Sequence, residues 1–249
     1  MSSDPLTLGF MQPYFLPYPG YFELIARSDV WLVFDDAQMI RRGWVNRNRI
    51  LHPAKSWQYV RVPVAQHGRE TLIRDIRIAD PNWAERLVGQ LAHYREAPYY
   101  GELIPLIQGV GARRHERLID VNLALLTALC ERLKIPFAPR LHSGLGLDRS
   151  RIQGPGDWAF EAAKALGATR YINPAGGREL FDPARFSAAG IELSILESSA
   201  GPYNQGGRPF EPGLSILDLL MFQAPEEARM RIAPASGAGV PSDSGERAA

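Results

Sequence analysis

The feature that most constrains the fold is a strand, loop, helix and strand pattern near the N-terminus. Residues 6–11 and 29–34 are short apolar runs typical of buried strands. Between them lie a loop rich in proline and aromatic residues, at 12–20, and a helical segment at 21–27. This order predicts a βαβ unit, because a helical crossover brings the second strand back in the direction of the first.

Periodicity extends the prediction along the chain. The 249 residues, of which 45% are apolar, are enough for one large α/β domain. Alternating segments at 57–64 and 71–79 predict neighbouring strands that extend the sheet. The other predicted elements are three helices at 81–95, 99–110 and 116–134, strands at 137–141, 169–172 and 191–196, and helices at 157–166 and 214–222.

We therefore predict an α/β fold with a largely parallel central sheet, flanking helices and a helical middle section at about 81–134. Residues 1–234 are expected to form a single domain. Residues 235–249 are small, polar and turn-rich, and are expected to be a disordered tail.

Composition excludes several classes of protein. The formal charge of +1 gives no overall field toward nucleic acid or an anionic membrane, so a polyanion site would have to be local. The single cysteine, Cys130, cannot form an internal disulfide, and its apolar helical surroundings favour a core residue over a nucleophile. The N-terminus lacks the pattern of a signal peptide, and no segment has about 18 uninterrupted apolar residues. We expect a cytoplasmic protein without membrane insertion.

The first candidate site combines the loop at 12–20 with the carboxylates that follow the second strand. In open α/β sheets, ligands bind beyond the carboxyl ends of the strands, where this loop and the two carboxylates would both lie. The alternative is a hydrophobic plug that seats the helix on the sheet. The candidate residues are Gln12 and Tyr14 for ligand binding, and Tyr18, Tyr21, Asp35 and Asp36 for catalysis.

A second cluster is strongly basic and follows the acidic pair. Guanidinium groups can grip a diphosphate in bidentate fashion, asparagines can orient hydroxyl groups, and the tryptophan offers a stacking face. The alternative is a solvated basic loop, partly neutralised by the acidic pair. The candidate ligand-binding residues are Arg41, Arg42, Trp44, Asn46, Arg47, Asn48 and Arg49.

Two further turns carry polar groups. One contains Asn173, Gly176 and Gly177, whose backbone could approach a ligand closely, although asparagine before proline is also an ordinary turn former. The other contains Tyr203 and Gln205, which could contact an acceptor. In the following helical segment, Ser215 and Asp218 are three residues apart, and we expect them to form an N-terminal capping pair rather than a catalytic one.

No metal-binding motif is visible, because no histidine has a second histidine or cysteine at zinc-site spacing. Asp35 and Asp36 could still hold magnesium through a bound phosphate, and an ion pair with Arg41 or Arg42 is the structural alternative. We therefore predict no metal bound by the protein alone. Whether Mg²⁺ binds together with a nucleotide is left open.

Five motifs carry a resemblance to a known family. Between Leu8 and Phe222 they occur in the order MQPYFLPYPGYFELI, FDDAQMIRRGWVNRNRI, YINPAGG, YNQGG and LSILDLLMF. Together they resemble the WbqC-like family. That resemblance implies a role in the biosynthesis of O-antigen and other surface polysaccharides, or of small-molecule natural products.

A shorter stretch is similar to the nucleotidyltransferase superfamily with the HxGH signature. The corresponding run here is Tyr18-Pro19-Gly20-Tyr21, which implies a HUP-like N-terminal unit with a nucleotide cleft. Tyrosines replace both histidines, and a phenol cannot become cationic near neutral pH. This departure argues against adenylyl transfer itself.

These observations favour a group transferase that carries out aminoacyl, glycosyl or nucleotidyl transfer from a nucleotide-linked or phosphorylated donor. Transfer from a ready-made donor mainly needs positioning and one base, for which Asp35 or Asp36 is the candidate. The expected partner is a small molecule, with an aminoacyl-tRNA end as a further option. The alternative is a non-catalytic nucleotide-sugar-binding or assembly protein. Oligomeric state is left open.

Overall fold

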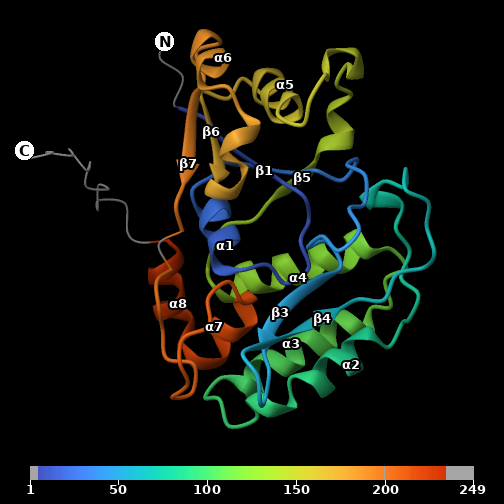
Figure 1. Ribbon diagram of the computed structural model, residues 1–249, viewed down its shortest axis with the longest axis vertical. Helices are drawn as coiled ribbons and strands as arrows, with labels where there is room; N and C mark the ends of the chain where they lie inside the picture. Colours follow the sequence, from blue (N-terminus) through green and yellow to red (C-terminus); the bar gives the residue numbers. More distant parts are fainter. Residues whose placement is uncertain (1–4, 199, 234–249) are drawn as a thin grey trace, which may run out of the picture.

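The computed structural model describes residues 5–198 and 200–233, and its centre is a five-stranded sheet (Figure 1). Every strand pair in this sheet is parallel, as the sequence predicted. The order is β5-β2-β1-β6-β7. The strands are β1 (Thr7–Met11), β2 (Val30–Val33), β5 (Pro139–Leu141), β6 (Arg170–Pro174) and β7 (Glu192–Leu196).

Helices cover both faces of the sheet and build a separate helical region (Figure 1). They are α1 (Pro19–Ala26), α2 (Trp83–Gln90), α3 (Tyr100–Ala112), α4 (Leu118–Arg132), α5 (Asp157–Ala165), α6 (Pro183–Ala188), α7 (Ile216–Phe222) and α8 (Pro225–Ile232). The predicted helical middle section is confirmed by α2, α3 and α4. The sequence analysis missed α6 and α8, because both are short and begin at a proline that was not recognised as a helix start.

The strands send alternate side chains into two apolar layers. Leu8 and Phe10 of β1 pack with residues of α5 and α6. Trp31 and Val33 of β2 belong to the larger core, which also contains buried residues of α1 and α4. At Gly9 an added Cβ would lie 2.3 Å from the Ser28 hydroxyl oxygen, so glycine allows the turn after α1 to pack against β1.

A β-hairpin stands apart from the central sheet. It consists of β3 (Arg47–Leu51) and β4 (Trp57–Arg61), which pair antiparallel. The prediction that 57–64 and 71–79 extend the central sheet is therefore wrong. Apolar and polar residues alternate in 57–64 because one face of the hairpin, at Ile50 and Val60, packs on the helical region. Residues 71–79 contain only a 3₁₀ turn at Ile73–Asp75 and isolated bridges.

The structure also bears on the predictions for Cys130 and for membrane-spanning helices. Cys130 is buried in α4, and burial raises the pKa of its thiol to about 12, which confirms it as a core residue. Within the described ranges, we find no helix whose length and apolar character would let it span a bilayer. The predicted tail at 235–249 lies outside the described residues.

Candidate functional site

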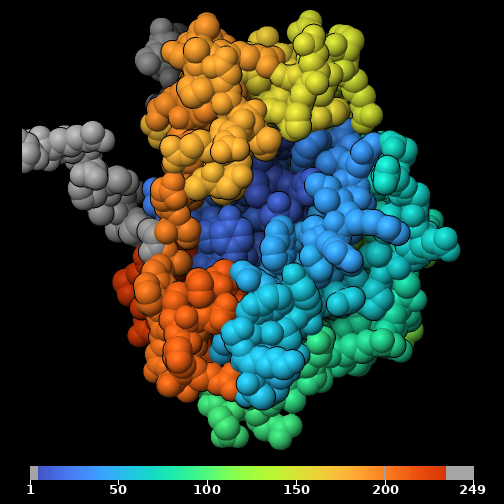
Figure 2. Space-filling model, in the orientation of Figure 1, coloured from blue at the N-terminus to red at the C-terminus, as the bar shows by residue number. Residues whose placement is uncertain are grey.

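A cavity of about 460 Å³ opens at the carboxyl ends of β1 and β6. From β1 the chain continues to β2 on one side, and from β6 to β7 on the other, so the cavity lies at a topological switch point of the sheet. In Figure 2 the dark-blue residues after β1 form its floor, between orange and light-blue surfaces. It is lined by Met11, Tyr14, Tyr18, Trp44, Asn48, Arg49, Asn173, Pro174, Gly176, Gly177, Leu180 and Gly213.

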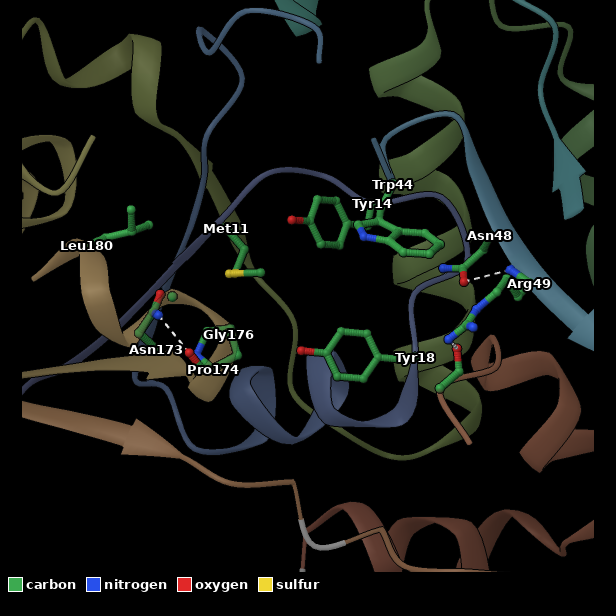
Figure 3. A pocket seen from close by; sticks show the side chains of 12 residues that line it. Met11, Tyr14, Tyr18, Trp44, Asn48, Arg49, Asn173, Pro174, Gly176 and Leu180 are labelled. Carbon is green, nitrogen blue, oxygen red and sulfur yellow. Dashed lines mark hydrogen bonds between the residues drawn. The ribbon is translucent and has the colours of Figure 1, made fainter. Parts of the chain in front are cut away.

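The loop between β1 and α1 contributes two phenol groups. The side chains of Tyr14 and Tyr18 point toward the space between Met11 and Asn173 (Figure 3). Burial raises the pKa of both phenols, and for Tyr18, with added repulsion from Tyr14 and Glu23, it reaches about 12. Both phenols therefore stay protonated at neutral pH, and neither hydroxyl is bonded to a described residue. They can donate hydrogen bonds to a ligand.

The other two polar candidates of this region, Gln12 in the loop and Tyr21 in α1, are not among the described residues that line the cavity. Tyr21 is fully buried, and its hydroxyl donates a 2.8 Å hydrogen bond to the backbone carbonyl of Gln12. Its ring is 5.6 Å from that of Tyr14. Tyr21 therefore supports the loop, as the predicted hydrophobic plug would, and ligand binding by Tyr14 and Tyr18 stays a prediction.

Strand β3 contributes Arg49, the one charged residue among those that line the cavity. Its guanidinium carbon lies 5.8 Å from the centre of the Trp44 ring and 5.1 Å from that of Trp57. Its Nη2 donates to the Gly213 carbonyl at 3.0 Å, while its buried Nε has no partner among the described residues. An added Cβ at Gly213 would lie 2.5 Å from Nη2, so glycine makes room for the guanidinium.

Asn48, the residue before Arg49, ties the hairpin to the first loop. Its buried amide nitrogen donates to the Phe15 carbonyl at 3.1 Å, and its amide oxygen accepts from the Arg49 backbone N–H at 2.8 Å. Arg49 is thus fixed by side-chain stacking and by its backbone, and it forms no ion pair with a described residue. A fixed guanidinium without a counter-charge is suited to an anionic ligand.

The opposite wall is the turn after β6. Asn173 accepts a 2.9 Å hydrogen bond from the Tyr171 hydroxyl and donates one to the Pro174 carbonyl (Figure 3). A Cβ at Gly177 would lie 2.3 Å from the Asn173 amide nitrogen, whereas one at Gly176 would meet nothing within 4 Å. The structure places all three predicted residues of this turn on the cavity wall, with the amide of Asn173 held by its own turn.

The predicted carboxylates do not line this cavity. Asp36 is buried after β2, where Oδ1 lies 2.5 Å from Nδ1 of His142 and Oδ2 accepts from Arg149 at 3.1 Å. Asp35 accepts from the backbone N–H and the hydroxyl of Ser143, at 2.9 and 2.6 Å. These groups form a second cluster, at the carboxyl ends of β2 and β5.

In this acidic cluster, the charge of the Asp36 carboxylate is stabilised by neighbouring basic side chains. Burial alone would raise the pKa of Asp36, but the hydrogen bond and charge of His142, with that of Arg149, outweigh it and lower the pKa. One ligand atom from each of Asp35, Asp36 and His142 lies within 4.8 Å of the others, so these residues could hold a cation. His142 was missed from the sequence, because it is 106 residues from its partner and no motif connects them.

The other predicted basic residues lie outside the cavity. Arg47 stacks on Tyr59, with its guanidinium carbon 4.2 Å from the ring centre, and bonds the carbonyls of Gly43 and Arg42. Asn46 donates to the Val62 carbonyl at 3.2 Å. Arg41 lines a different surface hollow, with His67 and Arg69.

The predicted acceptor residues Tyr203 and Gln205 belong to a buried structural network. The carboxylate of Asp218 accepts from the Tyr94 hydroxyl at 2.6 Å, and from Tyr203 and Gln205 at 2.7 Å each. Ser215 caps α7 as predicted, through the Leu217 N–H, but Asp218 does not complete a capping pair. The Asp218 side chain is buried among three donors that lie outside α7, so its spacing from Ser215 predicted the wrong role.

Comparison with known proteins agrees with the motifs. The model of the WbqC-like protein family matches residues 12–230. An uncharacterized protein of Mycobacterium tuberculosis, Rv1507c, is 30% identical in an alignment of 229 residues that covers 89% of this chain and 97% of that protein. No solved structure matches the chain. The extent of the family match and the similarity over most of both chains show that this chain belongs to the WbqC-like protein family.

Proposed function

We propose that this protein is a biosynthetic group transferase that binds a nucleotide-linked or otherwise phosphorylated donor in the cavity at β1 and β6. The observation that carries the proposal is Arg49, a guanidinium that lines the cavity at the switch point of a parallel sheet and forms no ion pair with a described residue. An anionic ligand would supply the missing counter-charge. Family membership supports a place in surface-glycan or natural-product biosynthesis.

The lining residues suggest a division of roles. Arg49 would bind a phosphate oxygen, Tyr14 and Tyr18 would donate to polar groups of the donor, and Trp44 would cover its planar or apolar part. A volume of about 460 Å³ is in the ordinary range for a small-molecule site. The strand order corresponds to the 3-2-1-4-5 portion of the doubly wound dinucleotide-binding order, which supports a nucleotide-like ligand and a HUP-like unit.

One observation favours a second candidate, a binding protein without turnover. Among the described residues that line the cavity there is no carboxylate, histidine or cysteine to act as a base or nucleophile. The predicted bases, Asp35 and Asp36, are held in the neighbouring cluster. A transferase would therefore rely on positioning and electrostatics in the cavity, with a base supplied by the acceptor substrate or by Asp35 or Asp36.

The first test is a thermal-shift panel of nucleotides, sugar nucleotides and aminoacyl-adenylate analogues, with and without Mg²⁺. A ligand at about 100 times its dissociation constant should stabilise the protein by roughly 2.7 kcal/mol. We expect Arg49→Gln to lose this shift and Arg113→Gln to keep it, because Arg113 is an exposed arginine at the end of α3. A shift that survives Arg49→Gln would overturn the proposed binding mode.

The second test separates turnover from binding. A ligand found in the panel is incubated with the protein and candidate acceptors, and release of its nucleotide or phosphate is followed by mass spectrometry. A transferase should release it in an acceptor-dependent way, with at least about 100-fold less release by Arg49→Gln at sub-saturating donor. Arg49-dependent binding without release would favour the non-catalytic role.

A further inference from the structure

The segment at 37–69 has a large net positive charge. It contains the cations Arg41, Arg42, Arg47, Arg49, Lys55, Arg61 and Arg69 and no acidic residue, although the whole chain has a formal charge of only +1. None of these seven side chains forms an ion pair with a described residue. Elsewhere arginines are commonly paired, as in Arg86 with Asp80 at 2.6 Å and Arg170 with Glu192 at 2.9 Å.

Part of this charge lies on one face of the β3–β4 hairpin. The register pairs Arg47 with Arg61 and Arg49 with Tyr59, and places Trp57 opposite Leu51. Alternation along the strands puts the arginines, Trp57 and Tyr59 on the outer face, where Leu51 at the end of β3 is buried, while Asn48, Ile50 and Val60 are buried on the inner face. We call the outer set, Arg47, Arg49, Trp57, Tyr59 and Arg61, the hairpin platform.

The platform interleaves guanidinium groups with aromatic rings. The rings of Trp57 and Tyr59 are 4.9 Å apart, Arg47 stacks on Tyr59 at 4.2 Å, and Arg49 lies over Trp57 at 5.1 Å. Arg47 uses Nε and Nη2 for the carbonyls of Gly43 and Arg42, so Nη1 remains for a phosphate, and the neighbouring rings offer surfaces on which bases can stack. Positive charge alternating with stacking surfaces is the arrangement by which proteins bind single-stranded nucleic acid.

The platform leads directly into the cavity. Arg49 belongs to both, and Trp44 lines the cavity within 6.0 Å of the Arg47 guanidinium. In Figure 2 the light-blue and cyan surface of the segment borders the dark-blue floor. A cavity of about 460 Å³ can admit one end of a strand but not a duplex.

We infer that the hairpin platform binds a single-stranded nucleic acid whose terminal nucleotide occupies the cavity. This inference rests on the proposed function, because it makes the nucleotide-linked donor a nucleic-acid end and not a free sugar nucleotide. The charge of the segment and its lack of acidic residues are complementary to the phosphate backbone.

The test is fluorescence anisotropy of end-labelled eight-nucleotide RNA and DNA with the full chain, between 25 and 200 mM KCl. If about three phosphates are neutralised, the plot of log K against log salt should have a slope of about −2. Arg47→Gln with Arg61→Gln should reduce the magnitude of that slope by about 1.4. The matched control, Arg113→Gln with Arg229→Gln, removes two exposed charges from α3 and α8 and should leave the slope unchanged.

A second variant tests stacking separately from charge. Tyr59→Leu should weaken binding about tenfold without changing the salt slope, since stacking on an aromatic ring involves no counterion release. The urea midpoint of each variant verifies that it is folded. Tighter binding of RNA than of DNA would identify the class of strand, and either preference supports the inference.

Three results would overturn the inference: no binding at 25 mM KCl, an equal loss in the control pair, or equal binding to phosphatidylglycerol vesicles that Tyr59→Leu does not weaken. The last result would assign the platform to a membrane surface. Failure here is distinguishable from failure of the proposed function. Arg49-dependent shifts with free nucleotides, but no binding of strands, would leave the proposed function standing alone.

Discussion

Two groups of polar residues lie at the carboxyl edge of the same parallel sheet, and they differ in whether their charged side chains are paired within the protein. In the acidic cluster at β2 and β5, Asp35 and Asp36 accept from Ser143, His142 and Arg149, although Nε2 of the buried His142 has no partner among the described residues. In the cavity at β1 and β6, Arg49 forms no ion pair with a described residue, and the hydroxyls of Tyr14 and Tyr18 bond none. A carboxylate that is already paired has little to gain from a ligand, whereas an unpaired guanidinium gains a charge-assisted hydrogen bond from an anion. The comparison therefore favours the cavity as the binding site.

The largest expected effect is that of Asp36→Ala on stability. Removing this carboxylate leaves His142, which is 2% exposed, and Arg149 without their partner, and breaking a buried pair costs about 3–5 kcal/mol. Because Arg149 is largely exposed, we expect the lower end, about 3 kcal/mol, from urea unfolding. Asp75→Ala, which removes an exposed carboxylate 4.0 Å from Arg74, should leave the urea midpoint unchanged.

If Asp36→Ala is nearly as stable as the wild type but no longer releases nucleotide from the donor, the acidic cluster is part of the catalytic site. In that case the acidic cluster and the cavity would belong to one functional site.

The next effect compares two neighbouring glycines on the cavity wall. Gly177→Ala would place a Cβ 2.3 Å from the Asn173 amide nitrogen, so Asn173 must move, at a cost of about 1–3 kcal/mol. Gly176→Ala meets nothing within 4 Å and serves as the control. We expect the ligand-induced thermal shift to be reduced in the first variant and retained in the second. Equal shifts in both would exclude the Asn173 turn from the binding wall.

A smaller effect on stability distinguishes Tyr18, the N-cap residue of α1, from Tyr21 within the helix. Tyr21→Phe removes a hydroxyl that bonds the Gln12 carbonyl in the interior, and should cost about 1 kcal/mol of unfolding free energy. Tyr18→Phe removes a hydroxyl with no described partner, and should change stability by less than about 0.5 kcal/mol while it weakens ligand binding. Urea unfolding and thermal-shift titration measure the two effects. If the two variants exchange these phenotypes, the structural role of Tyr21 and the ligand-binding role of Tyr18 are both wrong.

The smallest expected effect is the pH dependence contributed by Asp36. Its pKa is lowered in the folded protein relative to the unfolded chain. The stabilisation is therefore present above the unfolded pKa, near 3.9, and is lost as the pH falls through the folded pKa. Urea midpoints measured from pH 6 to pH 3 should fall less steeply for Asp36→Asn than for the wild type. Parallel curves would show that the carboxylate is not specifically stabilised by its partners.

The sequence predicted local structure well where one segment decides it. The βαβ unit, the three central helices and the parallel sheet were predicted because apolar periodicity and helix signals act over ten to twenty residues. The hairpin strand β3 was missed because its inner face contains a buried asparagine, Asn48, and its outer face two arginines. That pattern is indistinguishable from a basic loop until the helical region beneath it is known.

The candidate site was predicted in part. Eight of the proposed residues line one cavity: Tyr14, Tyr18, Trp44, Asn48, Arg49, Asn173, Gly176 and Gly177. The sequence had no means of preferring Arg49 over Arg47, although both lie on the same strand face. Contacts with Gly213 and Trp57, made by tertiary packing, hold Arg49 at the cavity, whereas Tyr59 and two backbone carbonyls hold Arg47 outside it.

Composition, periodicity and motif order are local properties of the chain, and they were enough to indicate the α/β class, the family and the polar motifs available for binding. Which of these motifs meet depends on tertiary packing. The pairing of Asp36 with His142, and of Asp218 with Tyr94, joins residues more than 100 positions apart. Such pairs depend on the strand order and on the burial of each group, and neither property is encoded in the spacing of the residues.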